Sequence, residues 1–140
     1  MFLSVVISTA GRPESLGESL AALAVQSFDR DAYQVIVGEN GGAAAAREIC
    51  AVFAGRFADF RYLHDARPGQ LVGWHRALEH VRGEVACFID DDVRPQPGWL
   101  AAIDDAFADP GVGLLTGPIQ GAFEADPPDW LDHLRLGEKG

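Results

Sequence analysis

Apolar and polar residues follow two different periods along this chain. Short runs rich in valine, isoleucine and phenylalanine predict β-strands, and apolar residues spaced three and four apart predict helices between them. The predicted strands are residues 2–7, 33–37, 60–63, 85–89 and 112–115. The predicted helices follow four apolar stripes, which are Leu16, Leu20, Leu23 and Ala24; Ile49, Phe53 and Phe57; Leu71, Trp74, Leu78 and Val81; and Leu100, Ile103 and Phe107.

The predicted strands are apolar on both faces, which is typical of a parallel sheet that helices cover on both sides. Strands that alternate with helices predict a doubly wound α/β domain. Right-handed crossovers leave few possible strand orders. We expect the order 3-2-1-4, with the first and fourth strands adjacent. A chain of 140 residues fits one domain of this kind.

The composition changes from Gly117, where glycines and prolines interrupt regular structure. Residues 129–134 predict one short helix. We therefore assign residues 1–120 to the α/β domain and residues 121–140 to a tail with a short docking helix. Exposed apolar side chains in such a tail favour an interface, so we expect self-association or a partner chain. The residues concerned are Phe123, Trp130, Leu131 and Leu134.

The charge balance excludes some classes of partner. The chain has 11 Lys+Arg against 21 Asp+Glu, a formal net charge of −10. We therefore expect no nucleic-acid partner, since binding to a phosphate backbone needs a basic surface. No apolar run approaches the roughly 18 residues that a membrane span needs, and the signal-peptide pattern is absent. Two cysteines give no disulfide framework, and we expect a cytoplasmic location.

Polar residues follow three of the predicted strands. Thr9 and Arg12 follow the first strand, Glu39 and Asn40 follow the second, and the run Asp90-Asp91-Asp92 follows the fourth. Ligands of open parallel sheets bind outside the carboxyl ends of the strands, where the strand order reverses. We therefore expect these side chains to converge on one ligand site.

The run Asp90-Asp91-Asp92 is the strongest single signal. Three carboxylates at the end of a buried strand repel one another unless a cation compensates them. Residues two apart on a strand share a face, so we expect Asp90 and Asp92 to share one cation. Carboxylates suit Mn²⁺ or Mg²⁺, which take further ligands from substrate phosphates. A solvated acidic loop and a cap for the next helix are the alternatives.

The remaining candidates carry weaker signals. Glu39 and Asn40 favour contact with the base and ribose of a nucleotide, and an ordinary turn is the alternative because Asn-Gly is turn chemistry. Thr9 either donates to the same nucleotide or ends its strand. The histidines lack metal-ligand spacing, and the nucleophile elbow and the phosphate-loop motifs are absent.

An ordered set of motifs resembles the family 2 glycosyltransferases from about Phe2 to Trp130. The set comprises Val5-Val6-Ile7-Ser8-Thr9 with Arg12-Pro13, Val35-Ile36-Val37-Gly38-Glu39-Asn40-Gly41, Arg67-Pro68-Gly69, Arg82-Gly83-Glu84, Phe88-Ile89-Asp90-Asp91-Asp92-Val93 and Pro97-Gly98-Trp99-Leu100. The resemblance implies a GT-A fold and a nucleotide-diphosphate sugar as donor, often a UDP-sugar. It also implies metal-dependent transfer of the sugar with inversion.

The resemblance further implies a role for particular residues. Thr9 and Glu39 would line the nucleoside pocket, and Asp91 would lie near the ribose or the sugar. Asp92 would hold the Mn²⁺ or Mg²⁺ ion that bridges the diphosphate. Such a cation neutralises the charge that grows on the departing diphosphate.

The chain departs from the family pattern at several positions. Glu39 stands where the family usually has aspartate, and Trp74 stands where an arginine is expected near the diphosphate. We expect Trp74 in the core, and Arg76 is the candidate substitute for the arginine. Family domains also continue further, so the chain resembles a truncated domain. We assign the general base that activates the acceptor to none of Glu124, Asp126, Asp129 and Asp132.

Two other classes of function stay open beside the glycosyltransferase. The missing arginine and the missing second half favour a catalytically silent nucleotide-binding or protein-interaction module of the same fold. A phosphotransfer receiver or an aspartate-nucleophile phosphatase is the third class. Both of those need an essential aspartate after an early strand, whereas the first strand here ends in Ser8-Thr9.

Overall fold

The described part of the chain is a parallel sheet with helices on both faces. The computed structural model describes residues 1–41, 44–122, 125–126 and 128. In chain order the elements are β1 (Leu3–Thr9), α1 (Pro13–Leu23), the 3₁₀ turn η1 (Arg30–Ala32), β2 (Tyr33–Asn40), α2 (Arg47–Ala54), β3 (Phe60–Asp65), α3 (Gln70–Leu78), β4 (Val85–Asp90) and α4 (Trp99–Phe107). The four strands are parallel, in the order β3-β2-β1-β4, which confirms the order expected from the sequence.

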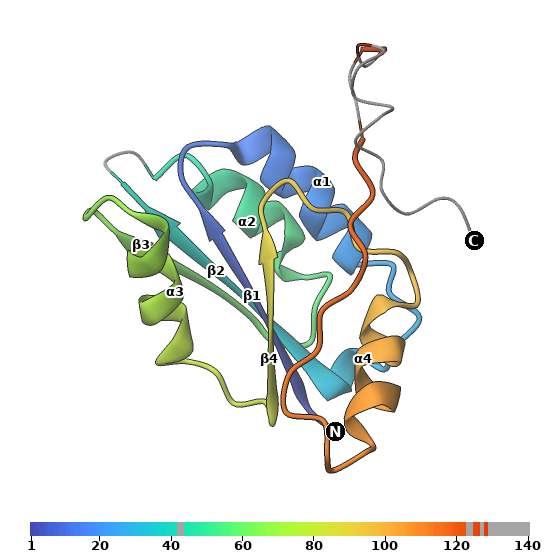
Figure 1. Cartoon of the computed structure of the whole chain (residues 1–140). Coiled ribbons are helices and arrows are strands. Elements are labelled where there is room, and N and C mark those ends of the chain that lie inside the picture. The colour runs from blue at the N-terminus through green and yellow to red at the C-terminus, as the bar shows by residue number, and fades with distance from the viewer. Residues whose placement is uncertain (42–43, 123–124, 127, 129–140) are drawn as a thin grey trace.

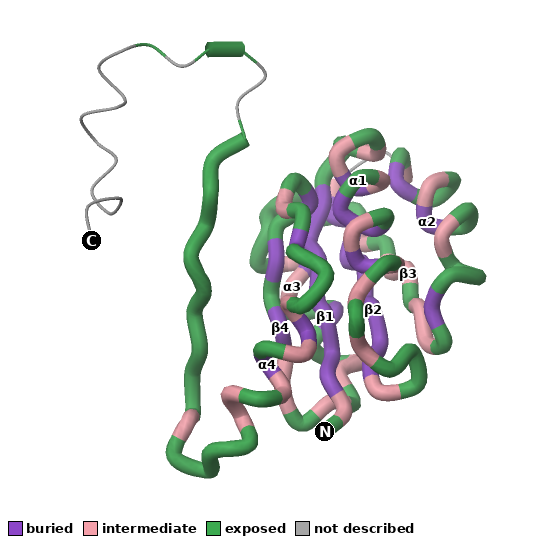
Figure 2. Tube along the Cα trace, turned by 90° about the vertical axis from the view of Figure 1, so that its right-hand side faces the viewer, coloured by how far each residue is buried: buried purple, intermediate pink, exposed green. Residues whose placement is uncertain are grey.

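The core lies on both faces of this sheet. The larger apolar cluster joins alternate residues of the strands to α1, α2 and α4, and the smaller cluster joins the other strand face to α3. Figure 1 shows α3 on the opposite face of the sheet from α1 and α2. Every residue of the inner strands β1 and β2 is buried, and these strands form the purple centre of Figure 2. Continuous burial is what a doubly wound sheet requires of its central strands.

Helix α3 packs on the sheet through small residues. A Cβ atom added to Gly38 of β2 would lie 2.6 Å from the carbonyl oxygen of Gly73 in α3, so the backbones meet directly. The apolar stripe predicted for α3 was therefore wrong in part, since Leu71 is 62% and Leu78 is 43% exposed. Trp74 packs against the smaller core as expected, with its ring 5.4 Å from that of Phe88.

The predicted fifth strand does not form. Residues 112–122 have no regular structure, and in Figure 2 this segment stands away from the sheet. Leu114 is 90% and Leu115 is 44% exposed, so the apolar run is largely unburied and pairs with no strand of the described sheet. An apolar run becomes a strand only where another strand and a covering layer meet it. The predicted docking helix at 129–134, and Phe123, lie outside the described residues. No helix in the described ranges is long and apolar enough to cross a membrane.

Candidate functional site

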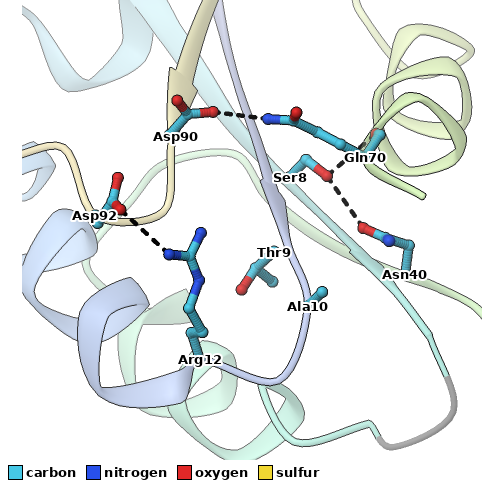
Figure 3. A pocket seen from close by; sticks show the side chains of 8 residues that line it. All are labelled: Ser8, Thr9, Ala10, Arg12, Asn40, Gln70, Asp90 and Asp92. Atoms are coloured by element: carbon cyan, nitrogen blue, oxygen red, sulfur yellow. Dashed lines mark hydrogen bonds and ion pairs between the residues drawn. The ribbon is translucent and has the colours of Figure 1, made fainter. Parts of the chain in front are cut away.

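A hollow of about 340 Å³ opens at the carboxyl ends of β1, β2 and β4. We call it the strand-end hollow, and Figure 3 shows its lining, which is Ser8, Thr9, Ala10, Arg12, Asn40, Gln70, Asp90 and Asp92. The hollow lies at the switch point of the sheet, where the strand order reverses. The chain adds β2 and β3 on one side of β1 and then crosses to add β4 on the other side. The convergence of three strand ends predicted from the sequence is therefore confirmed.

Asp91 is the buried centre of the acidic turn, by which we mean residues 90–92. Its side chain is fully buried, and its Oδ2 atom accepts hydrogen bonds from Thr9 Oγ1 at 2.6 Å and from Arg12 Nε at 3.2 Å. Arg12 Nη2 also forms an ion pair with Asp91 Oδ1. The Ser19 hydroxyl of α1 hydrogen-bonds to the carbonyl oxygens of Asp91 and Val93. These contacts fix the turn against the first strand and helix.

Asp90 and Asp92 face the hollow and are exposed. Gln70 Nε2 donates to Asp90 Oδ1 at 2.8 Å, and Arg12 Nη1 lies 3.2 Å from Asp92 Oδ2. The two aspartates do not share a strand face as expected, since β4 ends at Asp90 and Asp92 lies in the turn. They meet at the hollow instead. Arg12 lines the hollow with them, as the position after the first strand predicted, and it supplies part of the positive charge that this turn needs.

Glu39 has a different environment at the end of β2. It is 1% exposed and lies outside the lining of the hollow. Its Oε1 atom accepts from the Ala46 amide at 3.1 Å, and its Oε2 atom accepts from the Tyr62 hydroxyl. Burial, and then the hydrogen bond to Glu39, raise the pKa of Tyr62 above its ordinary value. Burial, and then the charge of Glu39, raise the pKa of the Cys50 thiol to about 12. Both oxygens of Glu39 are thus engaged inside the protein.

The neighbour of Glu39 reaches the hollow. Asn40 lines it, and the Ser8 hydroxyl donates to Asn40 Oδ1 at 3.2 Å. Arg76 does not reach the hollow, because it lies further along α3 and pairs with Glu79 Oε2 at 2.6 Å. Thr9 lines the hollow as expected, although its hydroxyl is already engaged with Asp91.

Sequence reasoning missed Ser8, Ala10 and Gln70 as lining residues. Gln70 opens α3 directly after Gly69, whose φ of 117° favours glycine. The chain must cross from β3 at one edge of the sheet to β4 at the other. Because α3 follows directly after the parallel strand β3, it begins near the carboxyl ends of the strands. Gln70 could have been predicted from its place as a polar residue that follows the third strand, combined with the strand order.

The lining chemistry fits a hard divalent cation. Two carboxylates, Asp90 and Asp92, face a polar hollow, and Mg²⁺ or Mn²⁺ is commonly held by one or two carboxylates plus phosphate oxygens and water. Within the described ranges, no group of three or more His, Cys, Asp or Glu side chains is arranged to hold an ion alone. A cation at this site would therefore draw its other ligands from a bound anion and from water.

Comparison with known proteins identifies the family. The sequence model named "Glycosyl transferase family 2" matches residues 4–139 of the chain. The chain belongs to glycosyl transferase family 2. This confirms the resemblance seen in the ordered motifs, and it sets aside the receiver and phosphatase alternatives.

Curated relatives of the chain are glycosyltransferases. Glycosyltransferase AglE of Haloferax volcanii is 26% identical over 143 residues, which cover 98% of this chain and 47% of AglE. The pre-mycofactocin glycosyltransferase of Mycobacterium tuberculosis is 29% identical over 96 residues, which cover 68% of this chain and 20% of that protein. The chain thus spans about half the length of AglE and a fifth of the mycobacterial enzyme.

Solved structures of similar fold confirm the GT-A architecture. The mannosyltransferase PcManGT from Pyrobaculum calidifontis, solved with GDP-Man and Mn²⁺, superimposes with a TM-score of 0.73 at 22% identity, covering 79% of this chain and 33% of PcManGT. TarS of S. aureus gives a TM-score of 0.71 at 22% identity, covering 79% of this chain and 20% of TarS. These likenesses show that the fold of this chain is a part of a GT-A domain.

Proposed function

We propose that the strand-end hollow binds the diphosphate of a nucleotide-sugar donor, together with Mn²⁺ or Mg²⁺ at Asp92 and Asp90. The chain would then be the donor-binding part of an inverting glycosyltransferase. One observation carries the proposal: two exposed carboxylates face a polar hollow at the switch point of a GT-A sheet. Membership of glycosyl transferase family 2 supports glycosyl transfer as the reaction class.

The structural neighbours support the class of donor. TarS was solved with UDP and with UDP-GlcNAc, and PcManGT with GDP-Man and Mn²⁺. A nucleoside diphosphate is therefore the ligand that we expect in this chain too, and UDP is the first to test. Thr9 lies beside the acidic turn, and the Asn40 amide lies on the wall of the hollow farther from that turn. We assign contact with the nucleoside to this wall.

The residues of the hollow have different roles in the proposed donor binding. A bound divalent cation supplies Lewis acidity and neutralises charge on the departing diphosphate. Asp90 and Asp92 would hold that cation, and the hydrogen bond from Gln70 orients Asp90 for it. Asp91 anchors the acidic turn on its buried side through its contacts with Thr9 and Arg12. These contacts support the proposal, since they fix the acidic turn at the end of β4 without a ligand.

A catalytically silent donor-binding module is the second candidate, and one observation favours it. Within the described residues, the carboxylates that line the hollow are Asp90 and Asp92. Both are assigned to the cation, so none remains there as a base for the acceptor hydroxyl, which inverting transfer requires. Release of sugar from UDP-GlcNAc or GDP-Man separates the two candidates, since a silent module binds these donors without consuming them.

Calorimetry with UDP and with GDP, in the presence and absence of Mn²⁺, tests the proposed function. Wild type should bind a nucleotide only with Mn²⁺, and Asp92→Asn should weaken that binding by more than about tenfold. Asp105→Asn removes the same charge from an exposed site on α4 and should bind like wild type. Absence of binding to either nucleotide, or equal binding by Asp92→Asn and wild type, would refute the proposal.

A further inference from the structure

Arg12 connects the buried and the exposed carboxylates of the acidic turn. Its Nε and Nη2 atoms contact Asp91. Its Nη1 atom lies 3.2 Å from Asp92 Oδ2, a contact drawn in Figure 3. Among the residues that line the hollow in the described part of the chain, Arg12 carries the only positive charge. Gly11, with a φ of 67°, forms the turn before Arg12, and Pro13 at the first turn of α1 restricts the backbone of Arg12. The contacts with Asp91 and Asp92 hold the guanidinium at the acidic turn.

The two contacts of Arg12 differ in burial and therefore in strength. The Asp91 side chain is 0% exposed, whereas those of Arg12 and Asp92 are 54% and 56% exposed. A buried carboxylate that loses its charged partner destabilises a fold strongly. An exposed ion pair contributes little, and water or another ion readily replaces it. The contact with Asp91 is therefore structural, and the contact with Asp92 is exchangeable.

We propose that Arg12 is the resident counter-ion of the acidic turn, and that a divalent cation replaces it at Asp92 while Arg12 stays paired with Asp91. This deepens the proposed function and rests on it, since the cation is the one assigned to the donor. Arg12 is then a positioning residue that occupies Asp92 until the cation arrives. Its released Nη1–H groups remain at the rim of the hollow, where they can donate to an anionic ligand.

This exchange couples the cation to the nucleotide. A cation that arrives alone must displace Arg12 from Asp92 and meets the positive charge that remains nearby. When a diphosphate arrives with the cation, it accepts hydrogen bonds from the released Nη1 group and offsets that charge. Binding of each ligand therefore strengthens binding of the other by the same factor. Cation binding without nucleotide should be weak in wild type for this reason.

Titration of Mn²⁺ alone, followed by the electron paramagnetic resonance of free Mn²⁺, tests the exchange without nucleotide. Arg12→Gln should bind Mn²⁺ several-fold more tightly than wild type, because the competing charge is gone. It should also melt at a lower temperature, because Asp91 loses its partner, and Mn²⁺ should restore part of that loss. Arg94→Gln is the matched control, since Arg94 pairs with Glu18 and both side chains are more than half exposed. It should leave Mn²⁺ affinity and melting temperature near those of wild type.

Arg12→Lys keeps the test valid if Arg12→Gln fails to fold. The lysine ammonium keeps a positive charge for Asp91, but it lacks the planar fork that reaches both carboxylates at once. This variant should fold and bind Mn²⁺ more tightly than wild type. If the folded variants bind Mn²⁺ no more tightly than wild type, or if none binds it at millimolar concentrations, the proposal is overturned.

The outcome separates this inference from the proposed function. Nucleotide binding with Mn²⁺ in wild type, without tighter Mn²⁺ binding in the Arg12 variants, would remove the exchange and leave the donor site intact. Tighter Mn²⁺ binding in those variants, without nucleotide binding in any of them, would establish the exchange and remove the donor assignment.

Discussion

The two strands that flank β1, β2 and β4, carry carboxylates at their carboxyl ends, and the two carboxylates differ in environment. At the end of β2, Glu39 is 1% exposed and has its two oxygens engaged by the Ala46 amide and the Tyr62 hydroxyl. Beyond the end of β4, Asp92 is 56% exposed, and Arg12 contacts it across the open hollow. The first carboxylate joins protein elements to one another, and the second faces the space where a ligand can enter.

The difference shows that acidity at a strand end is not by itself a sign of ligand binding. What separates the two sites is the number of free acceptor positions. A carboxylate that already accepts hydrogen bonds on both oxygens inside the core has little left to offer a ligand. An exposed carboxylate with one exchangeable partner keeps its other positions free. The two ends can therefore be compared directly by substituting each of them.

The largest contrast is expected between Glu39→Ala and Asp92→Ala. Glu39→Ala leaves the Tyr62 hydroxyl and the Ala46 amide without their acceptor and opens a cavity, so the free energy of unfolding should fall by about 3 kcal/mol. Asp92→Ala should change it by less than about 0.5 kcal/mol, which is typical of exposed sites. Urea denaturation measures both values. Equal losses in the two variants would show that the two carboxylates do not differ in role.

A smaller effect is expected from the contact that holds α3 against β2. Gly38→Ala brings a Cβ atom against the Gly73 carbonyl oxygen, at 2.6 Å unless the backbone moves. Overpacking of this kind should lower the free energy of unfolding by about 2 kcal/mol. The helix should also shift, and with it Gln70 at the rim of the hollow. Gly55→Ala meets nothing within 4 Å and has an ordinary φ of −73°. It should unfold at the same denaturant concentration as wild type or slightly above it, because alanine has fewer unfolded conformations than glycine.

A still smaller effect is expected from the hydrogen bond between the Tyr62 hydroxyl and Glu39 Oε2. Tyr62→Phe should lower the free energy of unfolding by about 1 kcal/mol at neutral pH, because one oxygen of Glu39 loses its donor. The difference should shrink with rising pH. The pKa of Tyr62 is raised above 10.0 in the folded state. Its contribution to the free energy of unfolding is therefore complete below pH 10 and is lost progressively above it.

Unfolding of both proteins in urea between pH 8 and pH 11 measures this trend. Tyr33, Cys50 and Cys87 also have raised pKa values, chiefly because they are buried. They destabilise both proteins alike at high pH, so the difference between wild type and variant isolates Tyr62. A difference that stays constant or grows across this range would contradict the assigned hydrogen bond.

The smallest effect is expected from Arg76→Ala. Sequence comparison offered Arg76 as a substitute for a diphosphate-binding arginine, but its guanidinium pairs with Glu79 on the exposed side of α3. Nucleotide binding with Mn²⁺ should therefore match that of wild type within twofold, as calorimetry would show. A clear loss of affinity would mean that ligand binding draws this side chain into the hollow.

The sequence was sufficient to predict the strand order and the strand ends that meet at the hollow. Apolar runs such as those of β1 and β2 are unambiguous, and the switch-point rule then brings Thr9, Asn40 and the acidic turn to one edge. These features depend on patterns that are local in the chain. They remain informative without knowledge of the distances between side chains.

The environments of the individual side chains depended on contacts between residues that are distant in the sequence. Nothing near Glu39 in the sequence reveals that Tyr62 occupies its carboxylate, and nothing near Arg12 reveals that it pairs with Asp91, 79 residues away. The packing face of α3 was mispredicted because Gly73 and Ala77, which face the sheet, are small rather than conspicuously apolar. The strand predicted at 112–115 failed because periodicity cannot tell whether a strand has a neighbour.

The pairing of β1 with β4 also has a consequence for how the protein is made. Thr9 and Asp91 hydrogen-bond across 82 residues, and β4 closes one side of β1. A ribosome releases β1 first, and its edge stays open until the acidic turn has left the exit tunnel. An unpaired apolar strand edge invites association with other chains. Nascent chains that end before residue 85 are therefore the ones that most need a chaperone.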